Sequence, residues 1–214
     1  MKALATLLLS GALLAGCANR PQAPDWQVDA HGALGSFEQA YLGGEARAAD
    51  AEFARARRDL TATGQASVVA RAELTRCAVQ VASLVFEPCA GFESLRADSG
   101  PAEQAYADYL QGRAVDAALL PAQHRATAGG RADAAALAQI TDSLSRLVAA
   151  GVVLRAGNAS PQVLQLAVDT ASSQGWRRPL LAWLGAQLKL AEQRGAGDEA
   201  QRLRRRIALA GGTA

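Results

Sequence analysis

The spacing of apolar residues is the feature that most constrains the fold of this chain. From about residue 30 to the C-terminus they recur at steps of three and four. Such steps place side chains on one face of an α-helix, whereas a half-buried strand needs alternation at every second residue. No run alternates in this way with β-branched residues, and no Asn-Gly or Asp-Gly pair marks a hairpin between strands. The sequence therefore predicts an all-α fold.

Glycine and proline divide this helical pattern into segments. The breaks lie at Gly43-Gly44, Gly64, Pro88, Gly100-Pro101, Gly112, Gly129-Gly130, Gly157, Gly175 and Gly195 to Gly197. The segments between them have about 10 to 25 residues, which suits ordinary globular helices. Short links between consecutive helices imply antiparallel neighbours. We therefore expect antiparallel helical hairpins, arranged as an irregular array or bundle.

Two segments carry clearer local signals. Ser160 followed by Pro161 is typical of a helix N-cap with proline at the first helical position, and Gly175 is placed to end that helix. The apolar residues from Leu137 to Val148 form a single stripe. We interpret this stripe as one long helix.

The charge and composition exclude several classes of function. The formal net charge is only +2, and Lys2 contributes to it from the extreme N-terminus. Nucleic-acid binding needs a concentrated basic face, so we expect no nucleic-acid partner. Of the two histidines, neither His31 nor His124 lies in a metal-binding motif, and no phosphate loop, dinucleotide fingerprint or nucleophile elbow occurs. We expect no metal and no cofactor, with His124 as a solvated helix residue.

The end of the first apolar run resembles the lipobox of bacterial lipoproteins. Lys2 precedes an apolar run from Ala3 to Ala15 that is too short to span a bilayer. The run ends in Leu14-Ala15-Gly16-Cys17, with small residues before the cysteine. In that family the signal is removed and acyl chains are attached at the cysteine. The resemblance implies lipidation at Cys17, and two or more acyl chains give stable anchoring to a membrane.

The lipobox also sets the expected domain boundaries and location. It implies a signal peptide over residues 1–16, followed by a tether over residues 17–29, in which two prolines favour an extended chain, and a helical domain over residues 30–214. Ala18 stands where an inner-membrane retention signal would usually be Asp. By the sorting pattern of the family, this favours the outer membrane, with the domain facing the periplasm.

Cys77 and Cys89 remain after lipidation of Cys17 and can form a pair. An even number of cysteines in an oxidising compartment suggests a disulfide. A bond needs the two Cα atoms within about 7 Å. This requires the helix around Cys77 to end near residues 83–85, and Pro88 disfavours helix at Glu87. The sequence leaves open a disulfide or two buried free thiols.

Two stretches resemble the helix pairs of tetratricopeptide proteins. The first has Ala49, Phe53 and Ala56 at the spacing of the second helix in that family. The second runs from Leu184 through a glycine break to Ile207. In such pairs a small residue lets two helices approach while large residues fill the groove between them. The resemblance implies stacked helical hairpins, which commonly present grooves to partner proteins.

The densest group of aromatic and arginine side chains is Trp176, Arg177, Arg178 and Trp183. Such residues are enriched at binding hot spots, so this group is a candidate partner-binding site. At helical spacing they also serve as ordinary packing residues. The sequence leaves both interpretations open.

We therefore expect an outer-membrane lipoprotein without catalytic activity that binds another envelope protein. Two alternatives come from other classes. A Glu93-Ser94 pair resembles the one used by lytic transglycosylases, which would make Glu93 the general acid of a peptidoglycan-processing enzyme, although the downstream motif of that family is missing. The third hypothesis is a carrier that holds an apolar ligand between helices.

Overall fold

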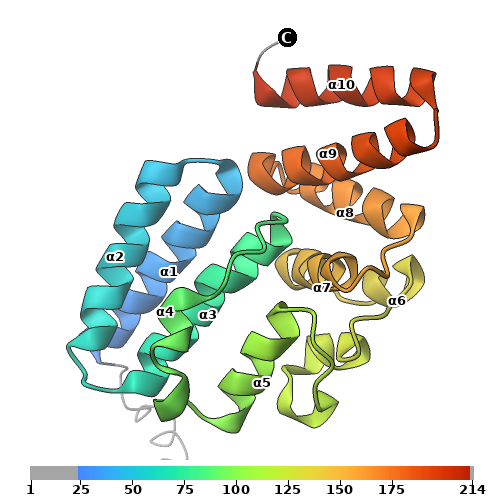
Figure 1. The fold of residues 1–214 in the computed structure, drawn as a ribbon. Helices are drawn as coiled ribbons and strands as arrows, with labels where there is room; N and C mark the ends of the chain where they lie inside the picture. The colour runs from blue at the N-terminus through green and yellow to red at the C-terminus, as the bar shows by residue number, and fades with distance from the viewer. Residues whose placement is uncertain (1–23, 213–214) are drawn as a thin grey trace, which may run out of the picture.

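The structure is a computed structural model and describes residues 24–212. Within this range every regular element is a helix, so the predicted all-α fold is confirmed (Figure 1). The α-helices are α1 (Asp25–Gly43), α2 (Ala46–Thr61), α3 (Ala66–Ala82), α4 (Ala90–Glu93), α5 (Pro101–Leu110), α6 (Ala134–Ala138), α7 (Ser143–Arg155), α8 (Pro161–Ser173), α9 (Arg177–Gln193) and α10 (Gly197–Gly211). Short 3-10 helices are η1 (Arg96–Asp98), η2 (Ala117–Leu119) and η3 (Ala122–Thr127).

The first two helices form an antiparallel hairpin at one side of the molecule (Figure 1). Gly44 ends α1 with φ 93°, a left-handed conformation that glycine adopts without strain. The rings of Phe37 and Phe53 meet with their centroids 5.1 Å apart. Ala49 and Ala56 are buried on the same face of α2. The small and large residues singled out in this stretch thus pack inside a helical hairpin, as expected.

Helix α1 begins earlier than the sequence suggested. Residues 25–29 were expected to belong to the tether, but they form the first turns of α1. The Pro24 carbonyl accepts hydrogen bonds from the N–H groups of Gln27 and Val28, so the helix starts directly after the proline. Trp26 packs against the hairpin, which adds apolar contact to this first turn. The helical domain therefore begins at residue 25 rather than at residue 30.

Helices α8, α9 and α10 follow one another as antiparallel hairpins in a layered stack (Figure 1). The Ser160 hydroxyl accepts a hydrogen bond from the Val163 N–H, and Pro161 opens α8. Gly175, with φ 66°, follows the end of this helix. The predicted start and end of α8 are both confirmed.

The long helix expected over residues 137–148 is wrong, because α6 and α7 are separate helices. The Asp142 carboxylate accepts a hydrogen bond from the Ser145 N–H at 2.7 Å and caps a new helix. Leu137 on α6 and Leu147 on α7 are both buried in one core. Their apolar spacing continues across the break because both helices face that core, so periodicity alone did not reveal the cap.

The C-terminal end of α3 is the point where distant parts of the chain meet. A Cβ on Gly151 of α7 would lie 2.5 Å from the Val81 carbonyl oxygen, so only glycine permits this approach. Trp183 of α9 is buried, and its Nε1–H donates to the Ala82 carbonyl at 3.0 Å. Leu84 then reverses the chain with φ 58°, a conformation rare outside glycine.

Helix α3 contributes to two apolar cores. The large core lies among the helices from α3 to α10 and includes Leu74, Phe92, Tyr109, Leu137, Leu147, Val168, Trp183 and Leu184. The hairpin core lies between the α1/α2 hairpin and another face of α3, and consists of Ala30, Phe37, Leu42, Ala49, Phe53, Leu60, Val69, Ala72 and Val79.

Candidate functional site

A cleft with a volume of about 560 Å³ lies in the described part of the chain and is here called the central cleft. Helices α1, α3, α5 and α7 form its walls, together with η2 and η3. Its lining is Glu38, Arg71, Leu74, Thr75, Ala78, Ala102, Glu103, Tyr106, Ala118, Leu119, Leu120, Pro121, Gln123, His124, Arg125, Leu144, Ser145 and Val148. A cleft of this size, mainly apolar and with a few polar groups, has the form of a ligand or peptide site.

His124 lies in the wall of the cleft and is 2% exposed. The expectation of a solvated histidine is therefore wrong. Its Nδ1 is 3.3 Å from the Tyr109 hydroxyl, which is also 2.6 Å from the Thr127 hydroxyl. The Tyr106 and Tyr109 rings lie beside the imidazole, with ring centroids 5.7 and 5.2 Å from it. The aromatic wall and the hydroxyl pair give the buried imidazole both packing and a polar partner.

Burial lowers the pKa of His124 to about 4, and the opposing effect of Asp142 is smaller. The imidazole is therefore neutral near pH 7. A neutral histidine in a cleft can accept or donate one hydrogen bond. The hydroxyl within reach of its Nδ1 belongs to Tyr109, which does not line the cleft. The arrangement supplies a polar contact for a bound group rather than a nucleophile beside its base.

Two carboxylates, Glu38 and Glu103, also line the cleft. Burial raises the pKa of Glu38, and the nearby negative charge of Asp142 raises it further. Glu103 is held differently, because Arg71 Nε donates to its carboxylate at 2.9 Å and lowers its pKa. Glu38 thus has no ion pair among the salt bridges of the described residues. It is the rim group that a bound cation or hydrogen-bond donor would stabilise.

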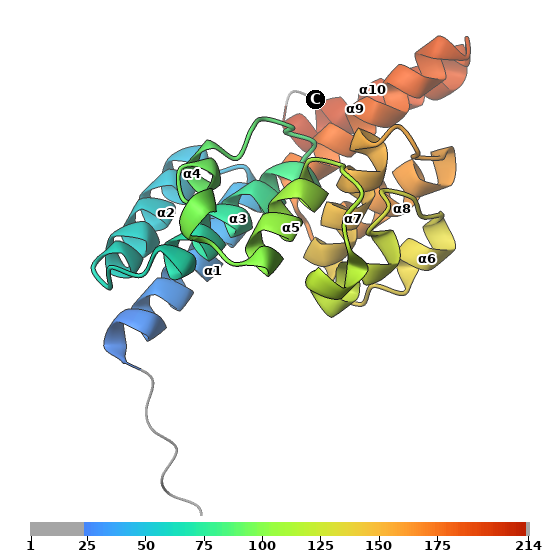
Figure 2. The same cartoon turned by 60° about the horizontal axis from the view of Figure 1, so that its bottom comes forward.

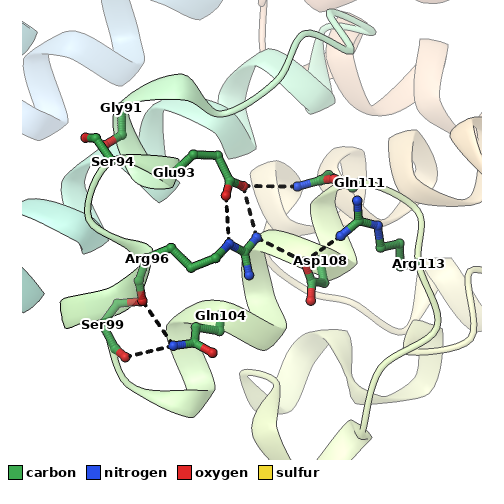
Figure 3. A network of polar contacts seen from close by, with 9 residues as sticks. All are labelled: Gly91, Glu93, Ser94, Arg96, Ser99, Gln104, Asp108, Gln111 and Arg113. Carbon is green, nitrogen blue, oxygen red and sulfur yellow. Dashed lines mark hydrogen bonds and ion pairs between the residues drawn. The ribbon is translucent and has the colours of Figure 1, made fainter.

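Glu93 lies outside the central cleft, in an ion-pair network between α4, η1 and α5 (Figure 3). Arg96 donates from Nε at 2.7 Å and from Nη2 at 2.9 Å to the two oxygens of the Glu93 carboxylate, and also binds Asp108. These hydrogen bonds lower the pKa of Glu93. A general acid needs a raised pKa in a dry site, whereas Glu93 is exposed and paired. The geometry does not support the catalytic hypothesis for Glu93.

The group Trp176, Arg177, Arg178 and Trp183 forms an internal joint. Trp183 is fully buried, and Trp176 packs against both cores. Arg178 Nε donates to the Tyr41 carbonyl at 2.8 Å, and its guanidinium lies 4.3 Å from the Tyr41 ring centroid. Arg178 thus fastens α9 to the end of α1, and Trp183 fastens it to the end of α3. Arg177 is exposed, but the group as a whole packs within the chain, so its use as a partner-binding site is not supported.

Cys77 and Cys89 are buried and form a disulfide, with their Cα atoms 5.8 Å apart. The geometric condition is met because α3 ends at Ala82 and the chain turns back at Leu84. The disulfide secures α4 against α3, beside the large core. Cys17, the expected lipidation site, lies outside the described residues, as does the expected signal peptide.

Residues 24–212 contain no helix that is both long and apolar enough to cross a membrane. In the same range no three acidic, histidine or cysteine residues gather as a metal site would require. No protein-family model, curated protein or solved structure matches the chain. The central cleft is the candidate site, on the geometry of its lining alone.

The residues of this cleft could not be recognised from the sequence alone. Two of the three tyrosines in the chain, Tyr106 and Tyr109, stand three residues apart within α5 and therefore share one side of the helix. In a chain so poor in aromatics, that pair was a usable signal. Glu38 and His124 come from segments far apart in the sequence, and no local pattern connects them.

Proposed function

We propose that this chain is a lipoprotein of the bacterial outer membrane, anchored through Cys17, whose periplasmic helical domain binds another envelope protein. The lipobox at residues 14–17 supports the anchor. The nearly neutral charge supports a protein partner over a nucleic acid. The proposal depends most on the central cleft, which supplies a place for the partner.

The cleft suits a segment of a folded partner because its floor is apolar and its rim is charged. Leu74, Leu120 and Val148 provide apolar surface from three separate elements. Glu38 and the Arg71–Glu103 pair lie at the edge, where they can select the charge of what enters. Hot-spot pockets combine an apolar anchor with such a polar rim.

A carrier of an apolar ligand is a second candidate, and the volume of the cleft favours it. About 560 Å³ falls in the range of small-molecule sites. The carrier hypothesis requires a ligand that remains bound through purification. Native mass spectrometry of the protein purified from its own membrane tests this directly. A stoichiometric apolar adduct, lost on Leu119→Asp at an exposed position of the cleft, would favour the carrier over the adaptor.

Site-directed photocrosslinking tests the adaptor. Leu119 lines the cleft and is 39% exposed, whereas Leu209 on α10 is 74% exposed and lies outside it. A photoreactive residue at position 119 should give one discrete adduct in the native envelope, and one at position 209 should not. The captured protein, purified separately, should then bind the wild type and lose affinity for Leu119→Asp while retaining it for Leu209→Asp. Equal adducts at both positions would contradict the adaptor proposal.

The anchor needs its own experiment, because the cleft could bind a partner in an unanchored protein. Cys17→Ser should abolish lipid attachment, measured by mass spectrometry of the N-terminal peptide, and should release the domain from the membrane fraction. Retention of an unlipidated Cys17→Ser chain on the membrane would reject the lipid anchor while leaving the cleft proposal standing.

A further inference from the structure

A second hollow, here called the α1 groove, opens where α1 begins. It has a volume of about 400 Å³ and runs along the first turns of α1 beside the end of α2 and the start of α3. Its lining is mainly apolar: Trp26, Gln27, Val28, Ala30, His31, Leu34, Leu60 and Val68. Figure 2 shows the first turns of α1 projecting beyond α2 and α3 at this end of the molecule.

The groove leaves large apolar side chains in contact with solvent. Val28 is 57% exposed, one of three large hydrophobic side chains so exposed in the described range. Trp26 is partly buried, with one side packed against the hairpin core. An amphipathic indole beside an exposed aliphatic residue is typical of side chains that sit at a membrane interface.

The position of the groove in the chain points to the bilayer as its occupant. Seven residues lead from Cys17 to Pro24, and they span at most about 25 Å along any path. If Cys17 carries the lipid, the groove can never lie farther than this from the membrane surface. Because the anchor keeps the groove close to the membrane, contact between the groove and the bilayer behaves like an intramolecular interaction. A small apolar contact area is then enough to maintain it.

The charges beside the groove indicate the kind of membrane contact. Residues 24–34 include the carboxylates of Asp25 and Asp29 but no lysine or arginine. A polybasic surface would bind anionic headgroups, and this segment lacks one. The attraction must therefore come from apolar contact with the interface, and salt, which screens the repulsion between these carboxylates and anionic headgroups, should not weaken it.

We propose that the α1 groove docks on the lipid bilayer, with Val28 and Trp26 inserted at the interface, and so sets the orientation of the domain on its membrane. This inference rests on the proposed anchor at Cys17. Docking fixes the direction of α1, and because Glu38 lies on the same helix, it also fixes which way the central cleft faces. The lipid supplies attachment, and the groove supplies direction.

Fluorescence quenching by brominated lipid tests the docking. The lipidated protein is placed in vesicles of phosphatidylethanolamine and phosphatidylglycerol, with or without bromine on the acyl chains. The Trp26 signal is the difference between the wild type and Trp26→Phe, because Trp176 and Trp183 remain in both. Bromine should quench most of this difference signal, at low and high salt alike.

Val28→Asp is the decisive variant, and Leu209→Asp is its matched control. Val28 is exposed, so the substitution leaves the fold intact, which circular dichroism checks. Losing one apolar side chain from the interface should shift the docking equilibrium about tenfold or more toward the undocked state. Trp26 quenching should therefore disappear in Val28→Asp. It should persist in Leu209→Asp, which removes an even more exposed side chain from α10 at the other end of the fold.

Three results would overturn the docking. The first is a Trp26 signal that bromine does not quench, and the second is quenching that survives Val28→Asp. The third is a Trp26 that neither bromine nor aqueous acrylamide quenches when Cys17 is lipidated, but that becomes accessible when Cys17 is not. That result would mean that the acyl chain of the protein itself, not the bilayer, occupies the groove. If mass spectrometry shows no lipid on Cys17, the anchor fails separately. Adding vesicles to that unlipidated chain, with and without Val28→Asp, then still decides the docking.

Discussion

The large core and the hairpin core both use α3, yet they are packed in different ways. In the large core, backbones approach closely at Gly151, the Trp183 indole is sealed against the Ala82 carbonyl, and the disulfide holds α4 in place. The hairpin core is built around an aromatic pair, Phe37 and Phe53, and opens at one end into the α1 groove. The large core is closed and held by contacts between distant segments, whereas the hairpin core is partly open at one end.

The closely packed large core serves as the scaffold of the molecule, whereas the hairpin borders the candidate sites. Helix α1 lines both the central cleft, through Glu38, and the α1 groove, through Trp26 and Val28. The large core supplies the opposite wall of the cleft, including the buried His124. The candidate sites thus lie where the open hairpin meets the braced scaffold. The following substitutions test this difference between the two cores.

Trp183→Ala should have the largest effect, because it removes the anchor of the braced core. The fully buried indole leaves a cavity and an unpaired Ala82 carbonyl. We expect a loss of about 3–5 kcal/mol in the free energy of unfolding. Urea unfolding followed by circular dichroism measures it. Trp176→Ala, at a partly buried indole between the two cores, should cost clearly less, and equal losses would contradict the contrast.

His124 should make the wall of the cleft sensitive to acid. In the unfolded chain the imidazole takes up a proton near its ordinary pKa of 6.5, but in the folded chain only near 4. The unfolded state therefore binds more protons between these values, and the free energy of unfolding falls as pH drops from about 6.5 to 4. The loss should approach about 3 kcal/mol below pH 4.

The measurement is urea unfolding across this pH range, compared among variants. His124→Gln should flatten the fall, since glutamine has nothing to protonate. A slope in His124→Gln equal to that of the wild type would show that the imidazole is not held neutral by burial.

Breaking the disulfide should loosen the bracing of the large core with a somewhat smaller effect. The bond joins residues 12 positions apart, and closing so short a loop is worth about 2–3 kcal/mol. Cys77→Ser together with Cys89→Ser should lower the midpoint of urea unfolding accordingly. Reductant should lower the wild type by a similar amount and leave the double variant unaffected. If reductant leaves the midpoint of urea unfolding of the wild type unchanged, the disulfide contributes nothing to stability.

Much of the fold was predictable because its signals are local. The cap at Ser160, the ending at Gly175 and the helical spacing each depend on neighbours within a few residues. The long helix over residues 137–148 failed where a local cap, Asp142, competed with a periodicity that two helices share. The start of α1 was missed since Pro24 was assigned to an extended tether, whereas it opens a helix.

The candidate site was less predictable because it is assembled from distant segments. Glu38, Tyr106 and His124 meet only once three separate elements have packed. The group from Trp176 to Trp183 stood out in the sequence because it is rich in aromatic and arginine side chains. Such side chains serve packing as well as binding, and here they pack inside the molecule. A single sequence shows that these residues are close together in the chain, but not whether their side chains point into the molecule or toward solvent.

Arg178→Ala should have the smallest effect on stability and give the sharpest test of the contrast, because it cuts the joint between α9 and the hairpin. The lost hydrogen bond to the Tyr41 carbonyl and the lost contact with its ring together amount to about 1–2 kcal/mol. Hydrogen exchange should quicken in α1 and α2 and stay unchanged in α7 to α9. Arg177→Ala, at the exposed neighbouring position, should alter neither. If exchange quickens equally throughout, the hairpin and the scaffold open as one cooperative unit, and the orientation of α1 cannot vary independently of the large core.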